Sequence, residues 1–254
     1  MSAPLAPPAP EAPSGGGPGR LGRLGVVQLA RAAHPRRALA TAVALAVAAA
    51  ASGRAAREVG LVLATVLVGQ ALLGWDNDLV DEAADREDER TDKPLVTGPL
   101  DRATVGFALA CGVLLVVPLS LSGGITAGIC YLLSLLVALA GNRWLRRGAL
   151  SWVPWAVGFA LYPAFLSYGG WGGGATGHPP TIAITVAAAV LGVGVHVLTS
   201  LSGLVEDNRA GRHHLPLRLA LRVGAPRLLA LSAAFCLLVL AVIAWVGATV
   251  GLSQ

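Results

Sequence analysis

Long apolar stretches, separated by short polar segments, make up most of the chain after its first residues. They consist mainly of Ala, Leu and Val, and charged residues, Gly or Pro stand between them. Most of them approach the length of about 20 residues that an α-helix needs to cross a bilayer. The pattern predicts seven transmembrane helices, at residues 38–53, 58–75, 104–121, 124–141, 148–168, 180–202 and 227–250. We therefore expect an all-α fold, a polytopic bundle of transmembrane helices.

Residues 1–24 differ in composition from the rest of the chain. They consist mainly of Pro, Gly and Ala, and a segment of this kind buries too little apolar surface to fold. We expect a disordered tail over residues 1–24 and a single transmembrane domain over residues 25–254. A secretory signal is an alternative for the first apolar stretch, but it is disfavoured because such signals begin near residue 1.

The composition supports a membrane protein and argues against several other classes. Hydrophobic residues make up 55% of the chain and charged residues 13%, whereas soluble domains average roughly 25% charged residues. Cys111, Cys130 and Cys236 lie in apolar stretches, which argues against a disulfide framework or a redox pair. The net charge of +5 comes from Arg-rich connections between the apolar stretches, so we expect no nucleic-acid partner.

The distribution of charge predicts the orientation of the chain. If the N-terminus is cytoplasmic, every Lys and Arg except Arg54 and Arg57 lies in a cytoplasmic segment or at its border, as the positive-inside rule requires. Nearly all of the 14 acidic residues then lie in two cytoplasmic stretches, residues 76–101 and 206–207. We expect a multi-pass protein of the cell membrane with the N-terminus and both acidic stretches in the cytoplasm.

The first acidic stretch directly follows the second apolar stretch. Asn77, Asp81 and Asp85 recur every four residues, so they share one face if the helix continues, with a drift of about 40° per step. Like charges at this spacing destabilise a helix that offers them no partner. Mg²⁺ prefers oxygen ligands and usually bridges one or two carboxylates to a phosphorylated substrate. The spacing therefore indicates a Mg²⁺ site, with a solvated charged loop as the alternative.

Basic residues follow both acidic stretches. Arg90 and Lys93 come after the acids Asp78, Asp81 and Asp85 of the first stretch, and Arg212 comes after Glu206 and Asp207 in the second. Such cations can contact the oxygens of a metal-bound diphosphate. Because both stretches lie on one side of the membrane, we expect them to form a metal–diphosphate site at the mouth of an apolar cavity.

At these residues the chain resembles the UbiA-type intramembrane prenyltransferases. The first motif of that family, Asn-Asp-x-x-Asp-x-x-x-Asp, is matched in full by Asn77, Asp78, Asp81 and Asp85. Lys93, before Pro-Leu, takes the place of an Arg in the family pattern. The resemblance implies that Asn77, Asp81 and Asp85 hold Mg²⁺ against a prenyl diphosphate, with Asp78 in support. It also implies catalytic roles for Asp81, Asp85 and Lys93.

The resemblance extends to two later stretches and is incomplete in the second. Residues 145–163 are similar to a basic loop of the family and the helix after it, which implies that Arg146 or Arg147 binds the diphosphate. A role in setting the topology is the alternative for this pair. The second motif of the family is Asp-x-x-x-Asp, and the resemblance implies that Asp207 is its catalytic, metal-binding member. Gly203 stands where the family has the earlier Asp.

The resemblance also sets expectations for the size of the bundle. The family usually has nine transmembrane helices, whereas this sequence predicts seven, and the similarity is good over residues 36–225 and poor beyond them. We therefore expect either a cavity that is more open to lipid or a homo-oligomer in which a second copy completes it.

The resemblance implies a transferase that moves a prenyl group from a prenyl diphosphate to an acceptor within the lipid bilayer. The sequence does not identify the acceptor. The alternative is a catalytically degenerate UbiA-like protein that binds lipid or serves as a partner subunit, and the altered second motif favours it. A transporter would place polar or charged residues near the middle of its helices, and the apolar stretches here hold almost none.

Histidine and aromatic residues add weaker candidates. His196 lies inside the sixth apolar stretch and is either a base at the acceptor site or a structural side chain. His213 and His214 are expected at the membrane interface without a specific role. Aromatic faces can stabilise a cation-like prenyl carbon, although packing is their commoner role in membrane helices. The aromatic candidates are Trp75, Tyr131, Trp152, Trp155 and Tyr162.

Overall fold

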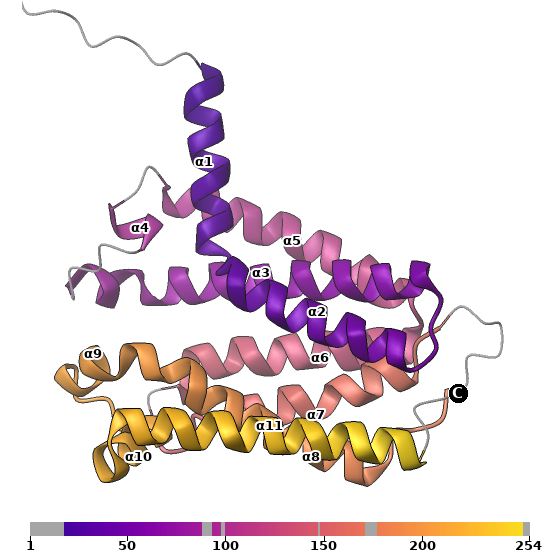
Figure 1. Cartoon of the computed structure of the whole chain (residues 1–254). Coiled ribbons are helices and arrows are strands. Elements are labelled where there is room, and N and C mark those ends of the chain that lie inside the picture. Colours follow the sequence, from indigo (N-terminus) through magenta and orange to yellow (C-terminus); the bar gives the residue numbers. More distant parts are fainter. Residues whose placement is uncertain (1–17, 88–92, 98–99, 147, 171–176, 251–254) are drawn as a thin grey trace, which may run out of the picture.

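A computed structural model of the chain describes residues 18–87, 93–97, 100–146, 148–170 and 177–250. Every regular element in these residues is a helix, so the all-α fold expected from the sequence is confirmed (Figure 1). In chain order the helices are α1 (Pro18–Ala32), α2 (Pro35–Ala51), α3 (Ala56–Glu87), α4 (Pro94–Thr97), α5 (Arg102–Ser122), α6 (Ile125–Ala140), the π-helix η1 (Gly141–Leu145), α7 (Val153–Ser167), α8 (Ile182–Ser200), the 3₁₀ turn η2 (Leu201–Gly203), α9 (Leu204–Arg209), α10 (Leu215–Val223) and α11 (Ala225–Val250).

All seven predicted apolar stretches form helices, but fewer are long enough to span a bilayer. Among the described residues, five helical runs are long and apolar enough to cross a membrane, and they contain α3, α5, α6, α8 and α11. The expected seven spans are therefore corrected to five by this criterion. α7 has 15 residues, because residues 148–152 form a bend and turns and the helix begins only at Val153. α2 has 17 residues, between the left-handed residue His34 and the turn at Ser52.

The N-terminal segment is more ordered than its composition indicates. α1 begins at Pro18, so the tail expected over residues 1–24 is helical over residues 18–24. Proline suits the start of a helix, because the N–H that it lacks would have no intrahelical partner there. The remaining part of that tail, residues 1–17, lies outside the described residues.

The long helices pack side by side and reverse direction at each connection (Figure 1). The main packed pairs join α2 to α3, α3 to α5, α5 to α6, α6 to α7, α7 to α8 and α8 to α11. The connections therefore gather at the two ends of the bundle. We name the end with α4, η1, α9 and α10 the acidic end, because both acidic stretches lie there, and the other end the opposite end.

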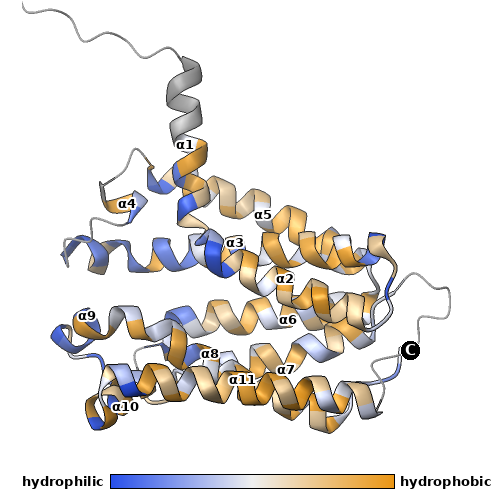
Figure 2. Ribbon diagram, in the orientation of Figure 1, coloured by the Kyte–Doolittle hydropathy of each residue, from blue (hydrophilic) through white to orange (hydrophobic). Residues whose placement is uncertain are grey.

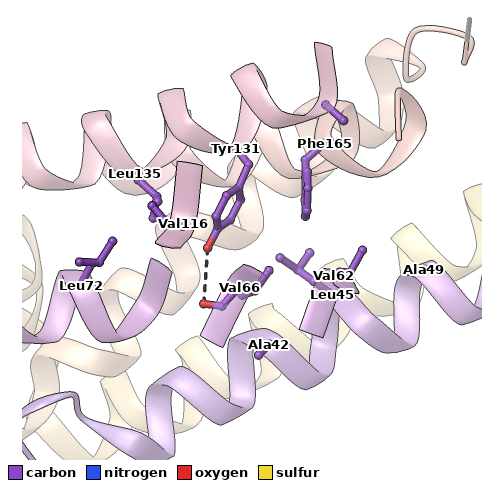
Figure 3. Close-up of a cluster of buried hydrophobic side chains, with 11 residues drawn as sticks. Ala42, Leu45, Ala49, Val62, Val66, Leu72, Val116, Tyr131, Leu135 and Phe165 are labelled. Carbon is purple, nitrogen blue, oxygen red and sulfur yellow. Dashed lines mark hydrogen bonds between the residues drawn. The ribbon is translucent and has the colours of Figure 1, made fainter. Parts of the chain in front are cut away.

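The main core lies between α2, α3, α5, α6 and α7 (Figure 3). Its largest fully buried side chain is Tyr131, whose hydroxyl donates towards the carbonyl oxygens of Thr65 and Val66, each 3.4 Å away. Gly69 leaves room for this ring, because a Cβ there would lie 2.1 Å from the Tyr131 hydroxyl oxygen. A close approach of this kind holds α6 against α3.

Apolar residues dominate the long helices (Figure 2), and many of their large side chains are exposed on the outside of the bundle. Phe107 and Leu114 on α5 are 73% and 77% exposed, and Ile182 on α8 is 83% exposed. A continuous apolar surface of this kind is a liability in water, but lipid tails are as apolar as leucine. The protein is therefore a multi-pass membrane protein.

Polar side chains cap helices at both ends of the bundle. Asp101 accepts a hydrogen bond from the backbone N–H of Thr104 (2.6 Å) at the start of α5, and this bond lowers the pKa of the exposed Asp101 carboxyl below its usual value. Thr181 caps α8 at the opposite end. These caps satisfy backbone donors that the first turn of a helix leaves free.

Candidate active site

The helix α3 continues beyond its apolar part and carries the first acidic stretch, as the four-residue spacing predicted. Asp78 and Asp85 are two turns apart and face the same cation. The Nζ of Lys93 lies 2.5 Å from Oδ1 of Asp78 and 3.7 Å from Oδ2 of Asp85. The structure thus brings together three residues that the sequence assigned to one site.

Asp78 is the most deeply buried acid of the first motif, with a side chain that is 2% exposed. Its Oδ1 also accepts a hydrogen bond from Nε2 of His34 (3.1 Å), whereas Oδ2 is buried without a hydrogen-bond partner. His34 has a φ of 50°, which is uncommon for a residue other than Gly, and it precedes α2. Leaving a buried carboxylate oxygen unpaired is unfavourable, so this oxygen is a candidate ligand for a cation.

Asp81 forms an ion pair with Arg146. Arg146 directly follows η1, and its backbone N–H donates to the carbonyl oxygen of Gly141 (3.1 Å), a π-helical bond that spans five residues. Of the two basic residues predicted here, Arg146 therefore reaches the first motif. The Asn77 amide, in the next turn of α3, is half-buried and has no side-chain partner among the described residues.

A further acid, Asp76, was not predicted as a site residue. Its side chain is 2% exposed and accepts hydrogen bonds from both terminal guanidinium nitrogens of Arg143, with Nη1 2.9 Å from Oδ2. Nδ2 of Asn142 lies 3.3 Å from the same Oδ2. The sequence offers one signal, an acid next to the motif and an Arg near Arg146, but the pairing depends on the packing of η1 against α3.

The second acidic stretch forms its own network. Oδ1 of Asp207 accepts a hydrogen bond from Nη1 of Arg212 (2.8 Å), and Oδ2 accepts one from Nε2 of His214 (2.7 Å). Nδ1 of His214 accepts the backbone N–H of Leu217 (3.2 Å), which leaves Nε2 to donate to Asp207. The expectation that His214 has no specific role is therefore wrong: its side chain is buried, caps α10 and joins that cap to Asp207.

Gly203 and Glu206 are two further residues of the second acidic stretch. A Cβ at Gly203 would lie 3.6 Å from Oδ2 of Asp207, so a side chain has room there. Oε2 of Glu206 is buried without a hydrogen-bond partner. Both acidic stretches lie at the acidic end of the bundle (Figure 1), and Asp207 there pairs with Arg212 and His214, which belong to its own stretch.

The first motif fits a hard divalent cation in its chemistry. Carboxylate and amide oxygens are the ligands that Mg²⁺ prefers, and the Lys93 ammonium already lies between two of the carboxylates. Within the described ranges, however, no three Asp, Glu, His or Cys side chains form a ready metal-binding group. For a metal to bind at this motif, the acids would therefore have to break their ion pairs with the basic residues.

The remaining predicted residues have mixed outcomes. Arg90 and Arg147 lie outside the described residues. Nε2 of His196 lies 3.0 Å from Oγ of Ser151, and its ring stacks on Trp155 with a centroid distance of 5.4 Å. This pairing is the structural alternative that the sequence left open for His196.

The aromatic candidates mostly have packing partners. Tyr131 lies in the main core, and Tyr162 is near it with a centroid distance of 6.5 Å. Trp75 donates its indole N–H to the carbonyl oxygen of Leu29 in α1 (3.0 Å). Trp152 lies in the turn before α7 and is 36% exposed.

A cavity of about 900 Å³ lies on another side of α3, against α5 and η1. Leu79 and Ala83 line it, and each lies two residues before Asp81 or Asp85, which is about 160° round the helix. Glu82, which also lines this cavity, pairs with Arg86. This cavity therefore belongs to a different face of α3 from the first motif.

The fold and the site define a class of protein: an all-helical, multi-pass membrane protein with paired acidic and basic side chains at one end of the bundle. Residues 38–253 match the sequence profile of the UbiA prenyltransferase family. The chain therefore belongs to the UbiA prenyltransferase family, and the resemblance seen in the motifs is confirmed. No curated protein and no solved structure matches the chain.

Proposed function

We propose that the protein transfers a prenyl group from a prenyl diphosphate to an acceptor in the membrane, in a Mg²⁺-dependent reaction at the acidic end. The observation that carries this proposal is the Lys93 ammonium between Asp78 and Asp85, beside a buried Asp78 oxygen without a partner. A cation is held there by oxygens that suit Mg²⁺ equally well. Membership of the family supports the reaction class.

The first motif would hold the metal. Asn77, Asp78, Asp81 and Asp85 are the proposed ligands, and bound Mg²⁺ neutralises the diphosphate and makes it a better leaving group. When the donor binds, Lys93 leaves the carboxylates and donates hydrogen bonds to the diphosphate oxygens. The ion pairs of the first motif thus neutralise the negative charges of its acids until the substrate binds.

The basic residues have the role of stabilising the leaving group. As the bond between the allylic carbon and oxygen breaks, the diphosphate leaves with the electron pair and gains negative charge. Lys93 and Arg146 lie at the motif acids, where they can stabilise that charge. The acceptor then bonds to the allylic carbon and loses a proton.

The second acidic stretch supplies the other proposed residues. Arg212 adds a positive charge near the diphosphate, and Asp207 orients it through their 2.8 Å hydrogen bond. A role of Asp207 as a metal ligand stays a prediction, since both of its oxygens already accept hydrogen bonds from Arg212 and His214.

Both oxygens of Asp207 already accept hydrogen bonds, and Gly203 offers no carboxylate where the resemblance implies an Asp. These two features favour a second candidate function. In this alternative the protein is a catalytically degenerate member that binds lipid or serves as a partner subunit. The first motif, with its complete set of oxygen ligands, argues for the transferase.

Binding of the donor tests the proposal. Prenyl diphosphates from short to long would be titrated into the purified protein in nanodiscs, with and without Mg²⁺, and compared with the variants Asp81→Asn and Glu82→Gln. We expect saturable binding that requires Mg²⁺, is lost in Asp81→Asn and is retained in Glu82→Gln, because Glu82 pairs with Arg86 and Arg102 and not with a cation of the first motif. Absence of binding across the panel would favour the degenerate subunit, and equal binding by Asp81→Asn would refute the site.

A further inference from the structure

The π-helical turn η1 makes two separate contacts with α3. Arg143, inside the turn, binds Asp76, and Arg146, directly after it, pairs with Asp81. Asp76 and Asp81 are five residues apart, which places them about 140° apart round α3 and roughly 7.5 Å apart along it. Two arginines three residues apart thus reach two acids on different sides of the same helix.

The π-helical bond sets this register. A π turn adds one residue to a helix, and here the bond runs from the N–H of Arg146 to the carbonyl of Gly141. In a regular α-helix the residues after the turn would be rotated by about 100° and would sit about 1.5 Å further along. Gly141 permits the close packing of the turn, because a Cβ there would lie 2.6 Å from Cβ of Pro154.

Asp76 is the buried acid of α3 that holds η1 in place. Its side chain is 2% exposed. Two guanidinium nitrogens of Arg143 donate hydrogen bonds to it, and the Asn142 amide adds a third donor. Bidentate pairs of this kind fix geometry as well as charge. With three donors on its two oxygens, Asp76 is the acid of this stretch least free to bind a metal.

We infer that Asp76 is a positioning residue for the diphosphate site: by holding Arg143 and Asn142 it fixes η1, and η1 carries Arg146 to the first motif. The inference rests on the proposed function, because Arg146 matters only if a diphosphate binds there. Asp76 itself contacts neither Asp81 nor the substrate. Its effect reaches the site through the backbone of one turn.

A double-mutant cycle tests this coupling. The affinity for inorganic pyrophosphate in the presence of Mg²⁺ would be measured by calorimetry for the wild type, Asp76→Asn, Arg146→Gln and the double variant. We expect each single change to weaken binding on the order of tenfold, the size of one lost charge-assisted hydrogen bond. The double variant should be no weaker than Arg146→Gln alone, because Asp76 acts only through Arg146.

Controls separate positioning from a general loss of structure. Glu82→Gln removes another paired carboxylate from the same helix and should leave the affinity unchanged. If Asp76→Asn does not fold, Arg143→Gln breaks the same contact from the half-exposed side. Additive losses in the double variant, or full affinity in both Asp76→Asn and Arg143→Gln, would overturn the inference. Failure of the wild type to bind any diphosphate would instead refute the proposed function.

Discussion

At the scale of single residues, Gly203 stands where the resemblance implies an Asp. It has room for a side chain, since a Cβ would make only ordinary contact with Asp207 Oδ2 at 3.6 Å, and its φ of −107° suits any residue. An Asp at this position would place a second carboxylate beside Asp207, one turn away on the helix.

The substitution Gly203→Asp should therefore fold normally and add a metal site. We expect the number of Mn²⁺ ions bound in the presence of pyrophosphate, counted by electron paramagnetic resonance, to rise by one per chain. Gly203→Asn is the matched control and should leave the count unchanged. Loss of folding in both variants would mean that Gly203 is needed for close packing, and an unchanged count in Gly203→Asp would mean that this turn does not face a metal.

The sequence placed the acids of the first motif on one helix, which is α3 in the structure, because four-residue spacing is a local property of a helix. Lys93, Arg146 and Arg212 were also predicted as cations of the site, and each does pair with a motif acid. The partners Asp76 and His34 were not, since their contacts join segments far apart in the chain. Periodicity within one helix carries no information about such contacts.

At the scale of helices, small residues determine how closely neighbours approach. Gly192 in α8 faces α7, and a Cβ there would lie 2.4 Å from the carbonyl oxygen of Trp155. Membrane helices rely on close packing of this kind, because lipid gives them little hydrophobic reason to associate.

Gly192→Ala should therefore destabilise the bundle, by about 1–3 kcal/mol, the usual cost of overpacking. Thermal or SDS unfolding of the protein in detergent would measure it. Gly60→Ala, in α3, is the control, because no atom lies within 4 Å of the added Cβ. Equal stability of Gly192→Ala and the wild type would mean that α7 and α8 can move apart to fit the added methyl group without a loss of stability.

The apolar stretches predicted all of the long helices, because bilayer-length hydrophobicity is a strong signal. The short elements were not predicted. η1 has no periodicity of its own, and α7 begins later than expected because the preceding residues turn before Val153. The apolar stretches thus predicted the helices of the bundle, but they did not predict the π turn that positions Arg146.

At the scale of the whole molecule, the distribution of basic residues predicts which end faces the cytoplasm. The acidic end holds every described Lys and Arg except Arg54 and Arg57, which lie at the opposite end. Arg54 donates to the carbonyl oxygens of Leu166 and Gly169, so it ties the α2–α3 turn to the end of α7. Its place away from the other cations thus has a structural reason.

Cysteine labelling in intact cells tests the orientation. In a background without Cys111, Cys130 and Cys236, Ala55→Cys should react with a membrane-impermeant maleimide, because it is exposed at the opposite end. His213→Cys, exposed at the acidic end, should react only after permeabilisation. The reverse pattern would place the acidic end outside the cell.

Helices that follow one another in the chain form the largest packed pairs from α2 to α11, and among the described residues no large contact joins α2 to α11. The sequence predicted the class of bundle, although it predicted seven spans and only five helical runs among the described residues are long and apolar enough to cross a membrane. It did not predict the order of packing, because apolar helices of similar composition can pack in many arrangements. A homo-oligomer in which a second copy completes the cavity stays a prediction.

Lys93 is the only lysine of the chain, and it lies between Asp78 and Asp85. Reductive methylation with ¹³C-formaldehyde would consequently give a single side-chain signal in an NMR spectrum, together with that of the N-terminal amine. The position of that signal would respond to the loss of the two carboxylates when the ammonium moves. A protein of 254 residues in a detergent micelle could then be followed, step by step during a titration, through one resonance.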